Sequence, residues 1–290
     1  MITYEWATRL SDAQRDEVAD LVAVAHADDA EGGFPTIALD ALRPGSRHLL
    51  VRLLGDDREG STIPAEPQLA ACLVLEPDAD DDGAGTVHYV VRPATRAHGV
   101  TTMLLERLGL DVRSPDGWAG TGVHRIRTLA SGDHPAARRI ARRFRSAGVR
   151  AGASEWYLLA STTRGGAAPS DVHLAGGAEL GAARALLGGD ALPADARILV
   201  RPGGDAITAA VWVDPDLTEE TEYGIAGSVR KVAAPQGDAG GLLVAALADL
   251  RASGRRVGAL TVPVDDDALV RTCRLLGFTH YRTNTEYCVA

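Results

Sequence analysis

Hydrophobic positions recur along the chain with two periods, which predict alternating helices and strands. Segment 11–26 follows a capping Ser11 and places Val18, Leu21 and Ala25 on one face, so it predicts an amphipathic helix. Further helices are predicted at 36–42, 100–112, 134–148, 241–254 and 266–277. Strands are predicted at 47–54, 68–77, 86–91, 124–130, 154–160, 205–215, 227–235, 256–262 and 285–289. Only weak signals occupy 172–204.

The second half of the chain repeats the first. VVRPATRAHGVTTMLLERL (90–108) lies over KVAAPQGDAGGLLVAALADL (231–250). The stretch 161–171 between the halves holds two glycines and a proline without periodic apolar positions, as is typical of a linker. We therefore expect an α+β protein with two tandem repeats, at 1–160 and 172–290, each a mixed, mostly antiparallel sheet flanked by helices.

Composition excludes several classes of protein. The 39 acidic and 30 basic residues give a net charge of −9, which argues against a nucleic-acid partner. Three cysteines without a CxxC or Cys/His cluster predict neither a disulfide framework nor a metal site. The first residues lack the basic and apolar stretches of a signal peptide, and no apolar run approaches the roughly 18 residues of a membrane span. A soluble, cytoplasmic, monomeric protein is expected, and the acidic run 78–85 fits a solvated turn.

Chemistry is predicted where a strand runs into a helix inside each repeat. In the first repeat Gly99 lacks a Cβ where the chain turns, so backbone N–H groups at the helix start would cradle an anion such as a pyrophosphate. A simple glycine turn is the alternative. In the second repeat Ala239 replaces that glycine and Asp238 adds a negative charge, which Lys231 offsets in part. Since the first loop also carries Arg96, these physical terms favour it as the anion site.

The same residues resemble a known family. VVRPATRAHGVTTMLL (90–105) and ALVRTCRLLGFTHY (268–281) are similar to motif A and the end of motif B of the GNAT acetyltransferases, whose R/QxxGxG/A loop binds the pyrophosphate of acetyl-CoA. The tandem arrangement, SGDHPAARRIARR (131–143) and RTCRLLGFTHYRTNTEY (271–287) resemble the two-repeat mycothiol synthase family. That resemblance implies direct acetyl transfer in the C-terminal repeat, to the cysteinyl amine of a glucosaminyl-inositol precursor. It implies an N-terminal repeat that binds acetyl-CoA without catalysing transfer.

The resemblance also implies two acetyl-CoA sites. The first comprises Tyr89, Val90, Val91, Ala97, His98, Gly99, Val100, Thr101 and Thr102. The second comprises Val229, Arg230, Lys231, Gln236, Gly237, Asp238, Ala239, Gly240, Gly241, Leu242, Phe278, Thr279, His280, Tyr281, Arg282 and Thr283.

Candidate catalytic and substrate residues depart from the family pattern. Glu222 is the carboxylate nearest to the position of the family's acidic strand residue, so it is the candidate catalytic base, with an exposed loop glutamate as the alternative. Asp40 and Asp190 are the candidate substrate-binding acids. Cys273 stands where GNAT enzymes often keep a tyrosine, and a small buried hydrophobe is the simpler interpretation.

These expectations lead to an N-acetyltransferase that uses acetyl-CoA and acts on a small-molecule amine. Two alternatives stay open: a non-catalytic acetyl-CoA-binding protein, and a GNAT enzyme for another amine. Catalysis predicts a carboxylate facing the cleft of the second repeat, whereas the binding protein predicts an apolar or blocked cleft.

Overall fold

The chain divides into two compact units. The computed structural model describes residues 2–31, 45–54, 67–78, 81, 83–164, 166–189, 192–204, 206–235 and 239–290. The first unit comprises Met1–Ala153 and Thr285–Ala290, and the second comprises Ser154–Asn284. These bounds differ from the predicted 1–160 and 172–290, because strands β6 (Arg150–Ser161) and β12 (Thr279–Val289) are each divided between the units. Among the described residues, no helix is long and apolar enough to cross a membrane.

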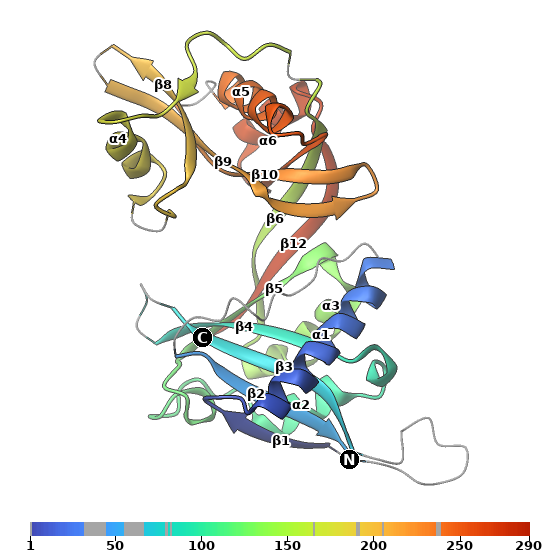
Figure 1. Cartoon of the computed structure of the whole chain (residues 1–290). Helices are drawn as coiled ribbons and strands as arrows, with labels where there is room; N and C mark the ends of the chain where they lie inside the picture. Colours follow the sequence, from blue (N-terminus) through green and yellow to red (C-terminus); the bar gives the residue numbers. More distant parts are fainter. Residues whose placement is uncertain are drawn as a thin grey trace. The chain divides into compact units, whose positions relative to one another are not determined.

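The first unit is a mixed sheet with helices on both faces (Figure 1). Its elements are β1 (Ile2–Ala7), α1 (Asp12–Glu31), β2 (Arg47–Leu53), β3 (Gln68–Pro77), β4 (Ala84–Val91), α2 (Val100–Leu108), β5 (Arg125–Ala130) and α3 (Pro135–Arg143). Short 3-10 helices occupy Pro93–Thr95, Trp118–Gly120, Ser131–Asp133 and Arg145–Ala147. The strand order is β1-β2-β3-β4-β5-β12, in which β4 and β5 are parallel and the other neighbouring pairs are antiparallel.

Apolar side chains explain how these layers pack. The helix α1 presents Val18 and Leu21 to Leu50 and Val90, on the face of the sheet that Figure 1 shows it crossing. The opposite face packs against α2 and Trp118 in a separate buried cluster. Since successive side chains of a strand point to opposite faces, the nearly continuous apolar run of β3 fills both layers.

The second unit repeats this plan. Its elements are β6, β7 (His173–Leu174), α4 (Glu179–Leu186), β8 (Arg197–Gly203), β9 (Ala206–Thr221), β10 (Gly224–Ala233), α5 (Ala239–Ala252), β11 (Val257–Pro263), α6 (Asp267–Leu275) and β12. The order is β6-β11-β10-β9-β8-β7, with β10 and β11 parallel. The helices α5 and α6 cover one face through the buried core around Leu243 and Leu247, while α4 packs on the other face over β8 and β9.

The predicted fold class is confirmed, and most of the predicted elements are present. Each unit contains a parallel strand pair joined by a helix, β4-α2-β5 and β10-α5-β11. The elements that sequence patterns did not identify are β1, β7, β8 and α4. The helix predicted at 36–42 lies outside the described residues.

Candidate functional site

In the first unit, β4 diverges from its parallel neighbour. It stays paired with β3 to Val91, but it pairs with β5 only at Ala84, Gly85 and Thr86. Within the described residues, the β5-side edge of 87–91 therefore has no strand partner. Backbone N–H and C=O groups need hydrogen-bonding partners, so this edge can pair with an extended, amide-containing ligand. The predicted residues Tyr89, Val90 and Val91 lie on this edge.

The loop that follows β4 has the geometry of an anion cradle. Ala97 and Gly99 adopt positive φ angles of 67° and 74°, and α2 begins at Val100. A Cβ added at Gly99 would meet no atom within 4 Å, so backbone conformation rather than crowding favours glycine there. The first amides of a helix have no acceptor within the helix, so those of Val100 and Thr101 are available to an anion.

Side chains around this loop are engaged with the protein itself. The Arg96 guanidinium pairs with Asp28 at 2.8 Å and with Asp29 at 2.6 Å, so α1 compensates the positive charge that sequence reasoning assigned to the cradle. The Tyr89 hydroxyl lies 3.2 Å from the Thr101 hydroxyl, and burial raises the pKa of Tyr89 to about 12. His98 contacts the Arg96 carbonyl through Nδ1 at 3.0 Å.

In the second unit, β10 diverges from β11 in the same way. Residues 226–229 pair with 257–260, while pairing with β9 continues to Ala233. The register shifts between Val229 and Lys231, so Arg230 forms a bulge, and its guanidinium lies 5.3 Å from the centre of the Trp212 ring. Bulges bend a strand and increase its twist, which widens the opening between β10 and β11.

A pocket of about 240 Å³ lies where this opening meets two helices. Val232 and Pro235 line it from the end of β10, Ala239 from the start of α5, and Asp266 and Leu269 from α6. Ala239 is the first residue of α5, and a right-handed helical residue does not carry the strain that a left-handed conformation would impose. The predicted residues Gln236, Gly237 and Asp238 lie outside the described part of the chain.

A cation from a distant strand reaches the start of α5. A Cβ built on Gly241 would lie only 2.0 Å from Nη2 of Arg201, so this arginine of β8 packs directly against the helix start. Its Nε lies 2.9 Å from Asp171 Oδ2. Sequence reasoning missed Arg201, because the weakly patterned segment around it aligns with no motif.

The face of this sheet opposite α5 carries an aromatic and ionic cluster formed by Tyr157, Glu219, Tyr281 and Arg282. Arg282 binds both carboxylate oxygens of Glu219, with 2.9 Å between Nη2 and Oε2, and its guanidinium lies 3.8 Å from the Tyr157 ring centre. The rings of Tyr157 and Tyr281 pack on the buried group that contains Ala226 and Ala259. Burial and the Glu219 carboxylate raise the pKa of Tyr157 well above its ordinary value, so its hydroxyl is protonated at neutral pH.

This cluster lies at the point where β10 and β11 separate. Leu260 pairs with Val229 at the last parallel register position, and with Leu158 of β6 on its other side. Tyr157 precedes Leu158 in β6 and pairs with Thr261, which is one residue beyond the last parallel pair of β10 and β11. A group that passes between β10 and β11 from the α5 face therefore emerges beside the cluster.

The other predicted site residues have different environments. Glu222 lies in the exposed turn between β9 and β10, at the opposite end of β10 from the pocket, and its carboxylate raises the pKa of the exposed Tyr223. Phe278 and Leu242 are buried in the α5 core, and Thr279 donates to the Leu159 carbonyl at 3.3 Å. Lys231 is exposed.

Four more positions complete the comparison with the expectations. His280 contacts Thr283 at 2.9 Å. Cys273 is fully buried, and burial raises the pKa of its thiol to about 12, which fits a small core residue. Asp40 and Asp190 lie outside the described residues, so their predicted role stays a prediction. Among the described residues, no group of three His, Cys, Asp or Glu side chains is placed to hold a metal ion.

Sequence comparisons find a relative over half of the chain. No protein-family model matches the chain. A mycothiol acetyltransferase from Saccharomonospora viridis is 32% identical over 144 residues, which make up 50% of this chain and 41% of that protein. The matched region thus spans less than half of this relative's length.

Solved structures match over nearly the whole chain. A GCN5-related N-acetyltransferase from Sphaerobacter thermophilus has a TM-score of 0.62 at 15% identity, covering 98% of this chain and 95% of its own. A tandem GNAT protein from the clavulanic acid biosynthesis pathway has a TM-score of 0.62 at 14% identity, covering 100% and 98%. The chain therefore has the tandem GNAT fold, and the predicted resemblance is confirmed at the level of the fold.

Proposed function

We propose that this protein is an N-acetyltransferase that transfers acetyl from acetyl-CoA to a primary amine in its second unit. The observation that carries the proposal is the opening between β10 and β11, which has the α5 start on one face and the Tyr157–Glu219–Arg282 cluster on the other. We further propose that the acceptor is the cysteinyl amine of a glucosaminyl-inositol precursor, so that the product is mycothiol. The curated relative's name and the sequence motifs support this acceptor.

The residues around the opening fit acetyl-CoA. The unpaired edge of 230–233 offers backbone groups to the amides of the pantetheine arm, and the α5 start with Arg201 offers amides and a cation to the pyrophosphate. In the first unit, 87–91 and the α2 start offer equivalent backbone groups. When bound, acetyl-CoA supplies an acetyl thioester, which is the only activated group that the reaction needs.

Glu219 and Tyr157 are the residues of this chain that we assign to proton transfer. Glu219 accepts a proton from the acceptor ammonium, and the free amine then attacks the thioester carbonyl carbon. As the C–N bond forms, the C–S bond breaks, and the departing thiolate takes the proton of the Tyr157 hydroxyl. The nitrogen then loses its second proton, which restores the Tyr157 hydroxyl, and Glu219 releases the first proton to solvent. Arg282 orients the Glu219 carboxylate through its two hydrogen bonds. We propose Glu219 for this role in place of Glu222, because Glu222 lies in the exposed turn.

One observation favours the alternative of an acetyl-CoA-binding protein without catalysis. Asp266 lines the pocket of the second unit, and a carboxylate there opposes the phosphates of the ligand. Asp266 is also the N-cap of α6, where its side chain accepts from the Leu269 amide at 3.0 Å, and this structural role accounts for its presence.

Calorimetric titration with acetyl-CoA separates these functions. We expect two sites in the unchanged protein, one removed by Gly99→Glu and the other by Gly241→Glu, since each glutamate puts a carboxylate at one helix start. Gly241→Glu also displaces Arg201. Circular dichroism checks that both variants fold. A single site that only Gly99→Glu removes would contradict catalysis in the second unit.

A turnover assay then tests the acceptor. The protein is mixed with acetyl-CoA and either the cysteinyl glucosaminyl-inositol or the same compound without its cysteinyl group. We expect release of free coenzyme A from acetyl-CoA only with the first compound. Comparable turnover of an unrelated primary amine would support a GNAT enzyme for another acceptor.

A further inference from the structure

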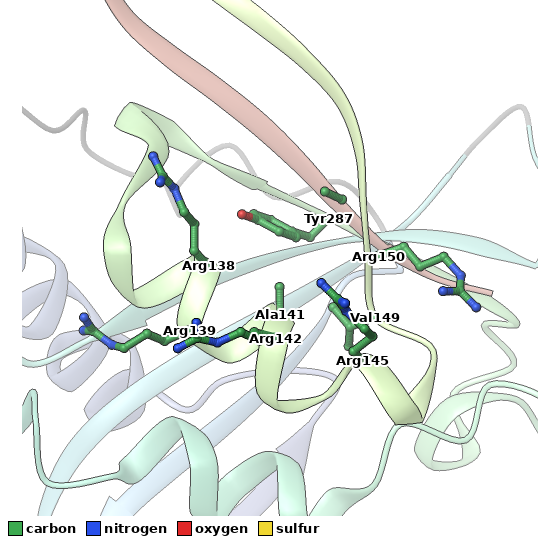
Figure 2. Close-up of a pocket in the computed structure, with 9 residues that line it drawn as sticks. Arg138, Arg139, Ala141, Arg142, Arg145, Val149, Arg150 and Tyr287 are labelled. Atoms are coloured by element: carbon green, nitrogen blue, oxygen red, sulfur yellow. The ribbon is translucent and has the colours of Figure 1, made fainter.

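The first unit contains a second pocket, separate from the α2 cradle. It encloses about 550 Å³, which lies within the range of sites for small molecules. Figure 2 shows side chains from α3, from the turn after it, from β6 and from β12 around this space. Arg138, Arg139, Arg142, Arg145 and Arg150 line it together with Tyr287. The pocket shares no residue with the predicted acetyl-CoA sites.

Most of the positive charge in this pocket has no counter-charge among the residues that the structure describes. Arg138 pairs with Asp133, but Arg139, Arg142, Arg145 and Arg150 make no ion pair with any described residue. The contrast with Arg143 is informative. That residue belongs to the same helix, does not line the pocket and pairs with Glu106. In a chain with a net charge of −9, four uncompensated arginines around one hollow are a local exception.

Helix stability does not explain this arrangement. A cation in the last turn interacts favourably with the helix dipole, which accounts for Arg142 and Arg143. The same effect does not extend to Arg150, which begins β6. Arg138 and Arg142 are four residues apart on α3, where like charges destabilise a helix. A bound anion would remove this repulsion.

We propose that this pocket binds a compact small molecule with several phosphate groups. Guanidinium groups bind phosphate oxygens through two parallel hydrogen bonds, and several arginines around one hollow suit a ligand with clustered negative charge. In Figure 2 the Tyr287 hydroxyl points toward the Arg138 side of the pocket, where it can donate to the ligand. A long polyanion fits less well, because it would extend past the arginines over the surface of a chain whose net charge is −9.

The test is calorimetric titration of the full chain with inorganic tripolyphosphate at low ionic strength. The same titration of Gly99→Glu/Gly241→Glu, in which a glutamate at each helix start repels the anion, shows whether the heat comes from those two helix starts. We expect one saturable site per chain whose affinity falls as salt is added. The double variant Arg142→Gln/Arg145→Gln should weaken binding about a hundredfold, or about tenfold for each arginine. The matched control Arg143→Gln should change the affinity less than about twofold, because its side chain pairs with Glu106.

Several results would overturn the proposal. The unchanged protein could give no saturable heat, or Arg143→Gln could weaken binding as much as the double variant does. A single-stranded oligonucleotide that displaces tripolyphosphate, and that needs the same two arginines, would show a nucleic-acid surface instead. All substituted arginines are exposed, so thermal melting should show that each variant folds as the unchanged protein does.

Discussion

The two units place the same backbone arrangement in different chemical surroundings. In the first unit α1 packs on one face of the sheet, against Val90 of β4, and two of its aspartates form ion pairs with Arg96. In the second unit α4 packs over β8 and β9, and the face at the β10/β11 opening carries Tyr157, Glu219 and Arg282 instead. A diverging strand pair needs only a backbone pattern, so both copies retain it. Proton transfer needs specific side chains, and we propose that the cluster at the second opening supplies them.

The two helix starts differ in which parts of the chain make them suitable for binding an anion. The first obtains its shape from positive φ angles at Ala97 and Gly99, while its nearby arginine is compensated by carboxylates. In the second, Ala239 already belongs to α5, and Arg201 of β8 lies against Gly241. A site can therefore lose its loop motif and still obtain a cation from another strand.

The largest expected difference between the units concerns transfer activity. Glu219→Gln removes the proposed proton acceptor, so kcat for acetyl transfer should fall at least about a hundredfold. The matched control Glu222→Gln alters an exposed turn residue three positions away and should change kcat less than about twofold. Steady-state kinetics measure both, and thermal melting shows whether the Glu219 variant folds. A larger loss in Glu222→Gln would return the catalytic role to the residue that the sequence predicted.

Charge at the helix starts should produce the next largest effect. Arg201→Gln should weaken acetyl-CoA binding at the second site about tenfold and leave the first unchanged. Arg96→Gln, the corresponding change in the first unit, should alter affinity less than about threefold, because Asp28 and Asp29 already compensate its charge. Calorimetry resolves the two sites. Equal losses in both variants would show that the two helix starts use charge in the same way.

A part-buried hydrogen bond between Tyr89 and Thr101, beside the first cradle, should contribute to stability. Tyr89→Phe removes the contact with Thr101 and should lower the free energy of unfolding by about 1 kcal/mol. Tyr4→Phe, at a residue that is 37% exposed, is the control and should have almost no effect. Urea denaturation at pH 7 measures both changes. A larger effect at Tyr4 would contradict the assigned packing.

The smallest effect concerns pH and the buried His48 of β2. Burial, opposed in part by a backbone contact with Ala7, lowers the pKa of His48 from its ordinary value of 6.5. Protonation then favours the unfolded chain, so this contribution to stability is complete above pH 6.5 and is lost as pH falls through the lowered pKa. His48→Gln should reduce the dependence of the urea midpoint on pH between pH 7.5 and 5.5. If the pH dependence of the urea midpoint is the same in His48→Gln, groups other than His48 cause it.

Local pattern accounts for much of the fold. The strand predicted at 68–77 is β3 with the same bounds, and the junction between 86–91 and the following helix is β4 and α2. Periodicity and turn residues act over a few positions, so one sequence read alone contains them. The repeat is visible for the same reason, because the helix between the two parallel strands has a similar apolar pattern in both copies.

Sequence by itself therefore determined the α+β repeat, the two strand-to-helix junctions and the resemblance from which the acetyl-CoA sites were predicted. Tertiary structure decided which side chains meet at those junctions. Arg201 lies 40 residues before Gly241 in the chain, and Glu219 lies 63 residues before Arg282, yet each pair is in contact. Residues 285–289 of β12 likewise pair with 126–130 of β5, although the two segments are far apart in the sequence. Such contacts depend on how strands are ordered in a sheet, and local periodicity does not specify that order.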